Sequence, residues 1–74
     1  MDTTEWEQQF EESIAREREA AIDLLDAARA MTGAFRPAGT SQADAATIFS
    51  RRYEQWREAA DAVSRLAENC IARH

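Results

Sequence analysis

The sequence predicts an all-α fold, an antiparallel hairpin of two helices that completes a four-helix bundle by dimerisation. Apolar residues recur at helical spacing in two long stretches, and the second stretch does not alternate as a strand would. Both glycines and the only proline lie between the two stretches. With 74 residues the chain is expected to form one domain, with a helix over about 4–32, a connection over 33–40 and a helix over about 41–73.

Sequence signals mark both ends of the first helix. Asp2, Thr3 and Thr4 offer side chains that can cap the first helix. Thr4 and Glu7 also have the spacing of a capping box, in which the two side chains bond the free N–H groups of the first turn. Apolar residues follow at helical spacing as far as Met31. Gly33 is then the expected left-handed residue that ends the helix, because glycine adopts that conformation without strain.

The connection is the only segment that fits neither a helix nor a strand. Pro37 disfavours helical geometry in the residue before it, and Gly39 supplies the freedom that a turn needs. Ser41 and Asp44 repeat the capping-box spacing, so the second helix should start near residue 42. We expect Phe35 to cover the end of the bundle.

The second helix carries the densest apolar stripe, with steps that alternate between four and three residues. This spacing averages one apolar residue about every 3.5 positions, which is typical of helices that pack lengthwise. The stripe consists of Phe49, Tyr53, Trp56, Ala60, Val63, Ala67 and Cys70. We expect it to be buried as the core, since aromatic residues at helical spacing usually supply buried area. An aromatic binding stripe is the alternative interpretation.

A short connection makes the two helices antiparallel neighbours, so residue i should face roughly residue 73 minus i. This register places Trp6 beside Ala67 and Leu66, and it places Glu17 opposite Trp56. Glu17 lies where the apolar stripe of the first helix requires an apolar residue, so it is either a partnered polar residue or the sign of a kink. Because a buried indole N–H needs an acceptor, we predict a contact between Glu17 and Trp56.

Two helices alone leave one side of each apolar stripe uncovered. A second copy, a kink within residues 15–19 that folds the first helix over, or a different protein could cover that side. We favour pairing, most simply as a homodimer, because burying each large apolar side chain stabilises by about 1.5–3 kcal/mol.

Composition and charge restrict the possible functions. The net charge of −5 disfavours direct binding to nucleic acid or to an anionic membrane. No apolar run is long enough to span a membrane, so a cytoplasmic protein is expected.

One cysteine and one histidine, without a base or nucleophile arranged around them, predict neither catalysis nor a cofactor. Cys70 and His74 are four residues apart, but a buried cysteine and a solvated terminus explain them better than a metal site.

The negative charge is concentrated in the first half of the chain. Residues 1–32 hold nine acidic residues and three arginines, a net charge of −6, whereas residues 33–74 have a net charge of +1. The acidic helix is either a solubilising surface or a surface that docks on a basic protein. The candidate contact residues are Glu5, Glu7, Glu11, Glu12, Glu19, Asp23 and Asp26. The second interpretation predicts an inhibitor or adaptor, analogous to small acidic phage proteins that block restriction or CRISPR machinery at nucleic-acid-binding surfaces.

Part of the second helix resembles a known family. Ala46, Phe49, Tyr53, Trp56 and Ala60 match the spacing that follows the turn in the Trp-x-Gly helical-hairpin substrates of type VII secretion. At the turn itself residues 31–33 read Met-Thr-Gly, without the family's tryptophan. The resemblance implies an antiparallel hairpin that pairs into a four-helix dimer. It gives an alternative function, that of a secretion-type hairpin whose role is to pair with a partner.

Overall fold

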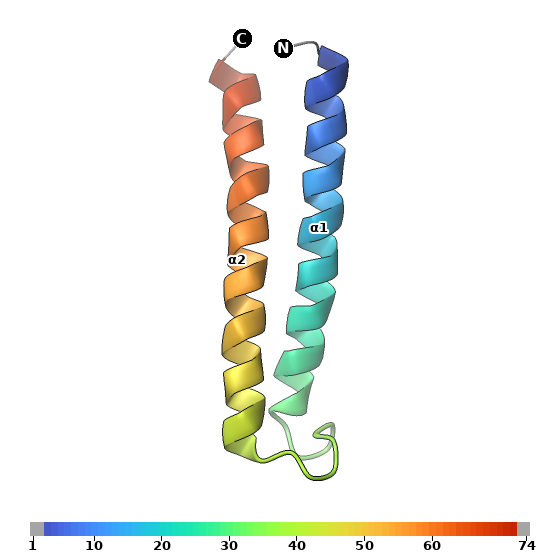
Figure 1. Ribbon diagram of the computed structural model, residues 1–74, viewed down its shortest axis with the longest axis vertical. Helices are drawn as coiled ribbons and strands as arrows, with labels where there is room; N and C mark the ends of the chain where they lie inside the picture. The colour runs from blue at the N-terminus through green and yellow to red at the C-terminus, as the bar shows by residue number, and fades with distance from the viewer. Residues whose placement is uncertain (1–2, 73–74) are drawn as a thin grey trace.

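The computed structural model describes residues 3–72 and contains two long helices, α1 (Thr3–Ala30) and α2 (Gln42–Ala72) (Figure 1). The helices run antiparallel and side by side, with the start of α1 and the end of α2 at the same end of the molecule (Figure 1). No strand occurs in the described range. The predicted all-α hairpin is therefore confirmed. In Figure 1 α1 continues without a sharp bend through residues 15–19, so it does not fold over at that point.

Two of the predicted cap features of α1 are absent, whereas Asp2, another cap candidate, lies outside the described residues. Thr4 lies inside the helix, so the predicted capping box of Thr4 and Glu7 is wrong. The helix ends at Ala30, and the last turn tightens as the Thr32 N–H donates to the Arg29 carbonyl at 3.0 Å. Among the described residues only Gly39 has a positive φ, so the predicted left-handed stop at Gly33 is also wrong.

Arg36 closes the end of α1 in place of a glycine cap. Its Nε donates to the Ala30 carbonyl at 3.2 Å, and its Nη2 donates to the Met31 carbonyl at 2.8 Å. The last carbonyls of a helix have no partner within the helix, and a positive charge is favourable beside them. The Phe35 side chain is 67% exposed, so the expectation that it covers the bundle end is wrong. The side chain that reaches the end of α1 is that of Arg36.

The start of α2 agrees with the sequence signals. The Thr40 N–H donates to the Pro37 carbonyl at 3.1 Å, closing a turn in which Gly39 has a φ of 85°. Glycine tolerates this conformation because it lacks a Cβ. The Asp44 N–H then donates to the Ser41 hydroxyl oxygen at 3.1 Å, and α2 begins at Gln42. The predicted cap by Ser41 is confirmed.

The register between the helices also agrees with the prediction. The Trp56 Nε1–H donates to Glu17 Oε1 at 2.9 Å, and the Trp6 Nε1–H donates to the Leu66 carbonyl at 3.0 Å. The paired residue numbers add up to 73 and 72, as the rule based on the hairpin centre requires. Both indole N–H groups are half-buried and both have an acceptor. The predicted contact between Glu17 and Trp56 is confirmed.

The fully buried part of the contact between the helices consists of small residues. The buried side chains are Ala27, Ala45 and Ser13, and no large side chain in the described range is fully buried. Phe49, Trp56 and Val63 are half-buried. Tyr53 is 44% exposed, so the expectation that the whole aromatic stripe is hidden is wrong for a single chain. One neighbouring helix covers one side of the stripe and leaves Tyr53 beyond its edge.

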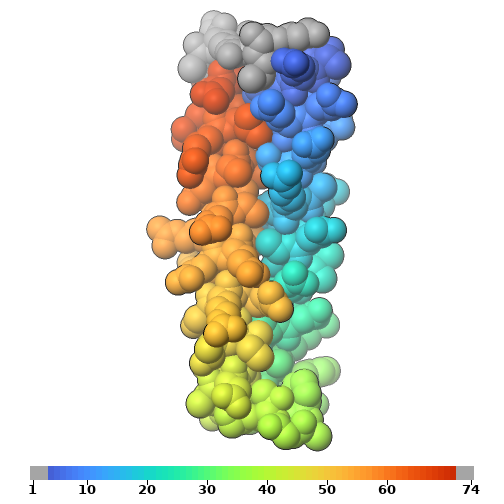
Figure 2. Space-filling model, in the orientation of Figure 1, coloured from blue at the N-terminus to red at the C-terminus, as the bar shows by residue number. Residues whose placement is uncertain are grey.

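The molecule is a rod with a large surface for its mass. It measures 51 × 16 × 13 Å (Figure 2), and its radius of gyration is 16.3 Å, against about 11 Å for a compact domain of this length. The exposed area is 5765 Å², against about 4,600 Å² for a globular monomer of 8.4 kDa. A single hairpin therefore leaves more surface in water than a typical folded monomer does. Neither helix, over the described residues, is long and apolar enough to cross a membrane.

Candidate protein-binding surfaces

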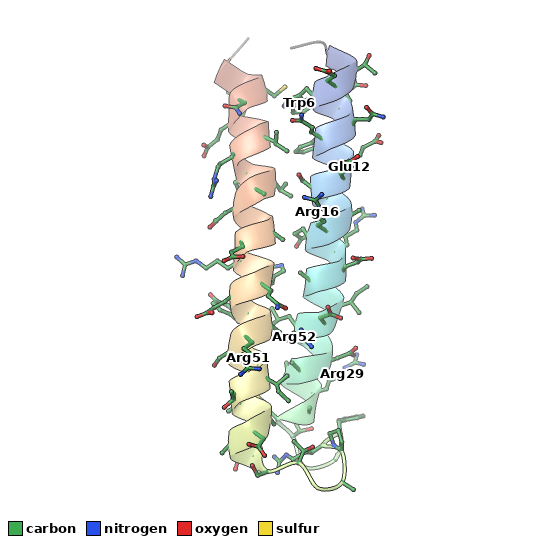
Figure 3. The ribbon with its side chains drawn as sticks, viewed as in Figure 1. Trp6, Glu12, Arg16, Arg29, Arg51 and Arg52 are labelled. Atoms are coloured by element: carbon green, nitrogen blue, oxygen red, sulfur yellow. The ribbon has the colours of Figure 1, made fainter. Side chains whose placement is uncertain are left out.

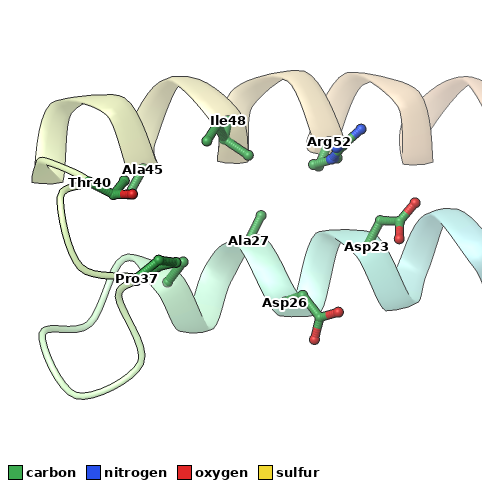
Figure 4. Close-up of a pocket in the computed structure, with 9 residues that line it drawn as sticks. Asp23, Asp26, Ala27, Pro37, Thr40, Ala45, Ile48 and Arg52 are labelled. Carbon is green, nitrogen blue, oxygen red and sulfur yellow. The ribbon is translucent and has the colours of Figure 1, made fainter.

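A groove runs between the helices on one side of the hairpin, close to the connection (Figure 4). It has a volume of about 320 Å³, and its floor contains the buried residues Ala27 and Ala45. Alanines on both helices leave room here because their side chains are short. The full lining is Asp23, Asp26, Ala27, Ala30, Pro37, Thr40, Ala45, Ile48 and Arg52. The groove thus combines an apolar floor with carboxylates on α1 and a guanidinium group on α2.

An acidic row leads along α1 to this groove. Its members follow one another at intervals of seven residues: Glu5, Glu12, Glu19 and Asp26. Positions seven apart on a straight α-helix differ by only about 20° in direction, so these four side chains form one line along the rod. All four are exposed. Glu12 is labelled on α1 in Figure 3, and Asp26 lines the groove in Figure 4.

The predicted contact residues do not all share this line. All seven acidic candidates are exposed. Asp23 lies beside the acidic row and also lines the groove. Glu7 and Glu11 are turned about 100–160° away from the nearest members of the row, because successive residues of a helix differ by about 100°. The structure therefore brings five of the seven candidates to one side of α1 and places two elsewhere.

An apolar face covers the opposite side of the hairpin. Leu25 comes two residues after Asp23 and therefore points away from the groove, and Tyr53 lies about 140° round α2 from Ile48. The exposed fractions are 59% for Leu25 and 44% for Tyr53. The apolar face consists of Ile14, Ala21, Leu25 and Ala28 on α1 and of Phe49, Tyr53, Ala60, Ala67 and Ile71 on α2.

The aromatic rings of α2 form a connected group along one edge of this face. The ring centroids of Phe49 and Tyr53 are 6.4 Å apart, and those of Tyr53 and Trp56 are 6.0 Å apart. Trp56 is held at its indole N–H by Glu17, so the group is anchored to α1 at one end. Tyr53 is the member with the largest exposure. An exposed aromatic ring with fixed neighbours suits a protein interface.

The cysteine is not assembled into a metal centre in the described part of the chain. Cys70 is a half-buried free cysteine, and residues 3–72 hold no group of three or more His, Cys, Asp or Glu side chains placed to bind a metal ion. His74, the other residue considered from the sequence, lies outside the described residues.

Sequence reasoning missed the groove and the alignment of the acidic row. The seven-residue repeat of the acidic row is visible in the sequence and could have revealed the alignment. The groove had a weaker signal, which is the position of Ala27 and Ala45 on facing turns. Comparisons with protein families, with curated proteins and with solved structures find no match to this chain.

Proposed function

We propose that this protein is a non-catalytic inhibitor or adaptor that docks its acidic row on a basic, nucleic-acid-binding surface of another protein. Two copies pair through the apolar face to form a four-helix bundle. The observation that carries the proposal is the acidic row, whose four exposed carboxylates stand in one line on a straight helix. The basic groups of a nucleic-acid-binding surface are arranged along the path of the phosphate backbone. A rigid line of carboxylates can face such a row of basic groups without rearranging.

The groove at the end of the row supports the same proposal. Arginine and lysine combine an apolar stem with a charged head. The Ala27 and Ala45 floor suits such a stem, and the Asp23 and Asp26 carboxylates suit the head. A partner's basic side chain would find an apolar floor and two carboxylates on the α1 side of this groove, and it would bind on that side because the Arg52 guanidinium group on α2 repels a second positive charge.

Pairing of two copies is supported by the surface area. The exposed area exceeds that of a typical monomer of the same mass by about 1,200 Å². A standard protein interface buries about 800 Å² on each partner. The second copy would thus cover surface that a single hairpin cannot bury, and it would leave the acidic row on the outside of the bundle.

Affinity capture from cells of the organism that encodes the protein tests the docking. We expect a captured protein that is displaced by added nucleic acid and by raising the salt from 50 to 500 mM. Exposed charge pairs weaken as the ionic strength rises, because salt shortens the range of the interaction to about 3 Å at 1 M. Glu12→Gln with Glu19→Gln should reduce capture.

A matched control separates the acidic row from net charge. Glu58→Gln with Glu68→Gln removes the same charge from exposed positions on α2 and should leave capture largely intact. Equal loss of capture in both double variants would mean that overall charge, and not the row, attracts the partner. Capture that survives high salt and excess nucleic acid would contradict the docking proposal.

The alternative is a hairpin that resembles the type VII secretion substrates and pairs with a partner hairpin. The observation that favours it is the apolar face, with Leu25, Tyr53 and Ile71 exposed on a single chain. Binding through that face should be insensitive to salt and should fail when Tyr53 is replaced by Glu. The salt titration therefore distinguishes the two functions in one experiment.

A further inference from the structure

The groove between α1 and α2 is short and is bounded at both ends. Pro37 and Thr40 line the end beside the connection, whereas Asp23 and Arg52 line the other end (Figure 4). Its volume of about 320 Å³ is near the lower limit for small-molecule pockets, which is about 300 Å³. A helix is about 10–12 Å thick and is too large to enter such a space. The groove therefore suits a single side chain of a partner.

The lining of the groove is apolar along its floor and acidic along α1. Ala27 and Ala45 are buried at the floor, and Ile48 stands on the α2 side with 43% of its surface exposed. The Asp23 side chain points from α1 toward α2, whereas Asp26 lies at the outer side of α1 (Figure 4). A side chain that matches this lining has an apolar stem and a cationic head, as arginine and lysine do.

We propose that the groove binds an arginine side chain of the partner, with its guanidinium group on the Asp23 carboxylate. This inference rests on the proposed docking and specifies the side chain that the groove selects. A guanidinium group is planar, donates two parallel hydrogen bonds to one carboxylate, and is more weakly hydrated than an ammonium group. The ammonium group of lysine is a strongly hydrated point charge, so it gains less from one carboxylate beside an apolar floor.

Arg52 determines the direction from which that arginine enters. Its Nη1 donates to Gln55 Oε1 at 3.1 Å, and Gln55 lies three residues further from the connection. This bond directs the Arg52 guanidinium group along α2 and away from the apolar floor. Its positive charge repels a second cation that approaches from the middle of the rod. The partner's arginine therefore enters from the connection end, over Pro37 and Thr40, and its head stops at Asp23.

Three capped peptides test the proposal on the purified protein. They are acetyl-Gly-Arg-Gly-amide, its lysine analogue, and its citrulline analogue, which has the shape of arginine without the charge. Backbone amide signals of Thr40, Ala27 and Ala45 in proton–nitrogen correlation spectra report on binding in the groove. We expect saturable shifts with the arginine peptide, and a dissociation constant about fivefold lower than that of the lysine peptide. The citrulline peptide should bind about tenfold more weakly than the arginine peptide.

Substitutions at exposed positions assign the contacts without disturbing the core. Asp23→Asn should raise the dissociation constant of the arginine peptide about fivefold, because it removes the carboxylate that accepts both hydrogen bonds. Asp26→Asn removes the same charge from the outer side of α1 and should raise it only about twofold. Arg52→Gln should lower it about threefold, because a repelling charge is lost. Circular dichroism confirms that each variant keeps its helix content.

Several results would overturn the arginine site. They are equal binding of the arginine peptide and either analogue, no saturable shift, unchanged binding in Asp23→Asn, and weaker binding in Arg52→Gln. Tighter binding of free arginine would indicate a small-molecule site instead. Shifts of these signals that grow with protein concentration alone would indicate that a second copy fills the groove.

A double variant outside the groove separates this proposal from the docking of the acidic row. Glu12→Gln with Glu19→Gln should leave binding of the arginine peptide nearly unchanged, although it should reduce capture of the partner from cells. If the peptide fails to bind while capture still depends on Glu12 and Glu19, the arginine site is wrong and the docking stands. If the peptide binds as expected while capture is insensitive to salt and to these two residues, the docking is wrong and the groove belongs to another partner.

Discussion

A single carboxylate on the contact side of α1 organises the centre of the hairpin. Glu17 is half-buried, and its Oε1 accepts the Trp56 indole N–H at 2.9 Å. Burying either group alone would cost free energy, because each would lose its bonds to water. Together they satisfy each other, and the bond defines which turns of α1 and α2 face each other. A buried polar pair can fix the register between two helices even when it contributes little to stability.

Replacing Trp56 by Phe should therefore destabilise the hairpin. The change removes the indole donor and leaves the Glu17 carboxylate half-buried without it, so we expect a loss of about 1–2 kcal/mol in the free energy of unfolding. Urea titration followed by circular dichroism measures this loss. Glu17→Gln in the intact chain is the matched control, because the amide oxygen can still accept the bond and the loss should be smaller. Equal stability of Trp56→Phe and the wild type would show that the bond contributes nothing.

For single residues, the sequence predicts contacts that depend on spacing along the chain. It misses contacts made by a long, flexible side chain. The pairing of Glu17 with Trp56 follows from the position of the connection and from the need of an indole N–H for an acceptor. Arg36 caps α1 from a position six residues beyond the carbonyl of Ala30. No spacing rule predicts that contact, because the backbone path of the connection decides which helix end the guanidinium group reaches.

The two helix ends at the connection, the end of α1 and the start of α2, are capped by different groups. The end of α1 uses a tightened turn and the Arg36 side chain, whereas the start of α2 uses a turn at Gly39 and the Ser41 cap. The sequence predicts the Ser41 cap, because a serine three residues before an acidic residue bonds to the backbone of its own helix start. It fails at Gly33, where a glycine after a helix suggested a left-handed stop. The helix already ends at Ala30, which leaves Gly33 within the connection.

A pair of glycine substitutions tests this difference. Gly39→Ala should lower the free energy of unfolding by about 1–2 kcal/mol, because a Cβ is strained at a φ of 85°. Gly33→Ala should be neutral or stabilising by up to about 1 kcal/mol, since its φ is not positive and the loss of unfolded-state freedom favours folding. A Cβ meets no atom within 4 Å at either position, so the comparison isolates the backbone. Equal effects of the two changes in thermal unfolding would contradict this account of the turn.

For the whole molecule, the sequence predicts two antiparallel helices but not how much of the apolar stripe one neighbour covers. The stripe of α2 has the step pattern of a helix seam, which identifies the fold. It is also wide enough to serve two neighbours, and spacing alone does not say which edge the first neighbour occupies. In the structure α1 buries Ala45 and leaves Tyr53 at 44% exposure. The edge of α2 on which α1 packs therefore determines which side chains stay exposed, and so where the acidic row and the apolar face lie.

Two exposed apolar residues of α1 provide a matched test of the apolar face. Leu25 belongs to that face and Ile22 does not, yet their exposed fractions in a single chain are 59% and 60%. Leu25→Glu should weaken the dimer by at least about 100-fold, since burying a leucine contributes about 1.5–3 kcal/mol and each dimer buries two. Ile22→Glu adds the same charge on the same helix and should leave the dimer nearly unchanged.

Sedimentation equilibrium and the concentration dependence of the melting temperature measure both variants of this pair. A protein whose stability depends on pairing melts at a temperature that rises with concentration, because mass action favours the associated state. That dependence should persist in Ile22→Glu and disappear in Leu25→Glu. Helix content at low concentration should be similar in the two variants, because neither side chain is covered by α2. If instead Ile22→Glu dissociates the dimer and Leu25→Glu does not, the second copy occupies the other side of α1, and the apolar face is available to a different partner.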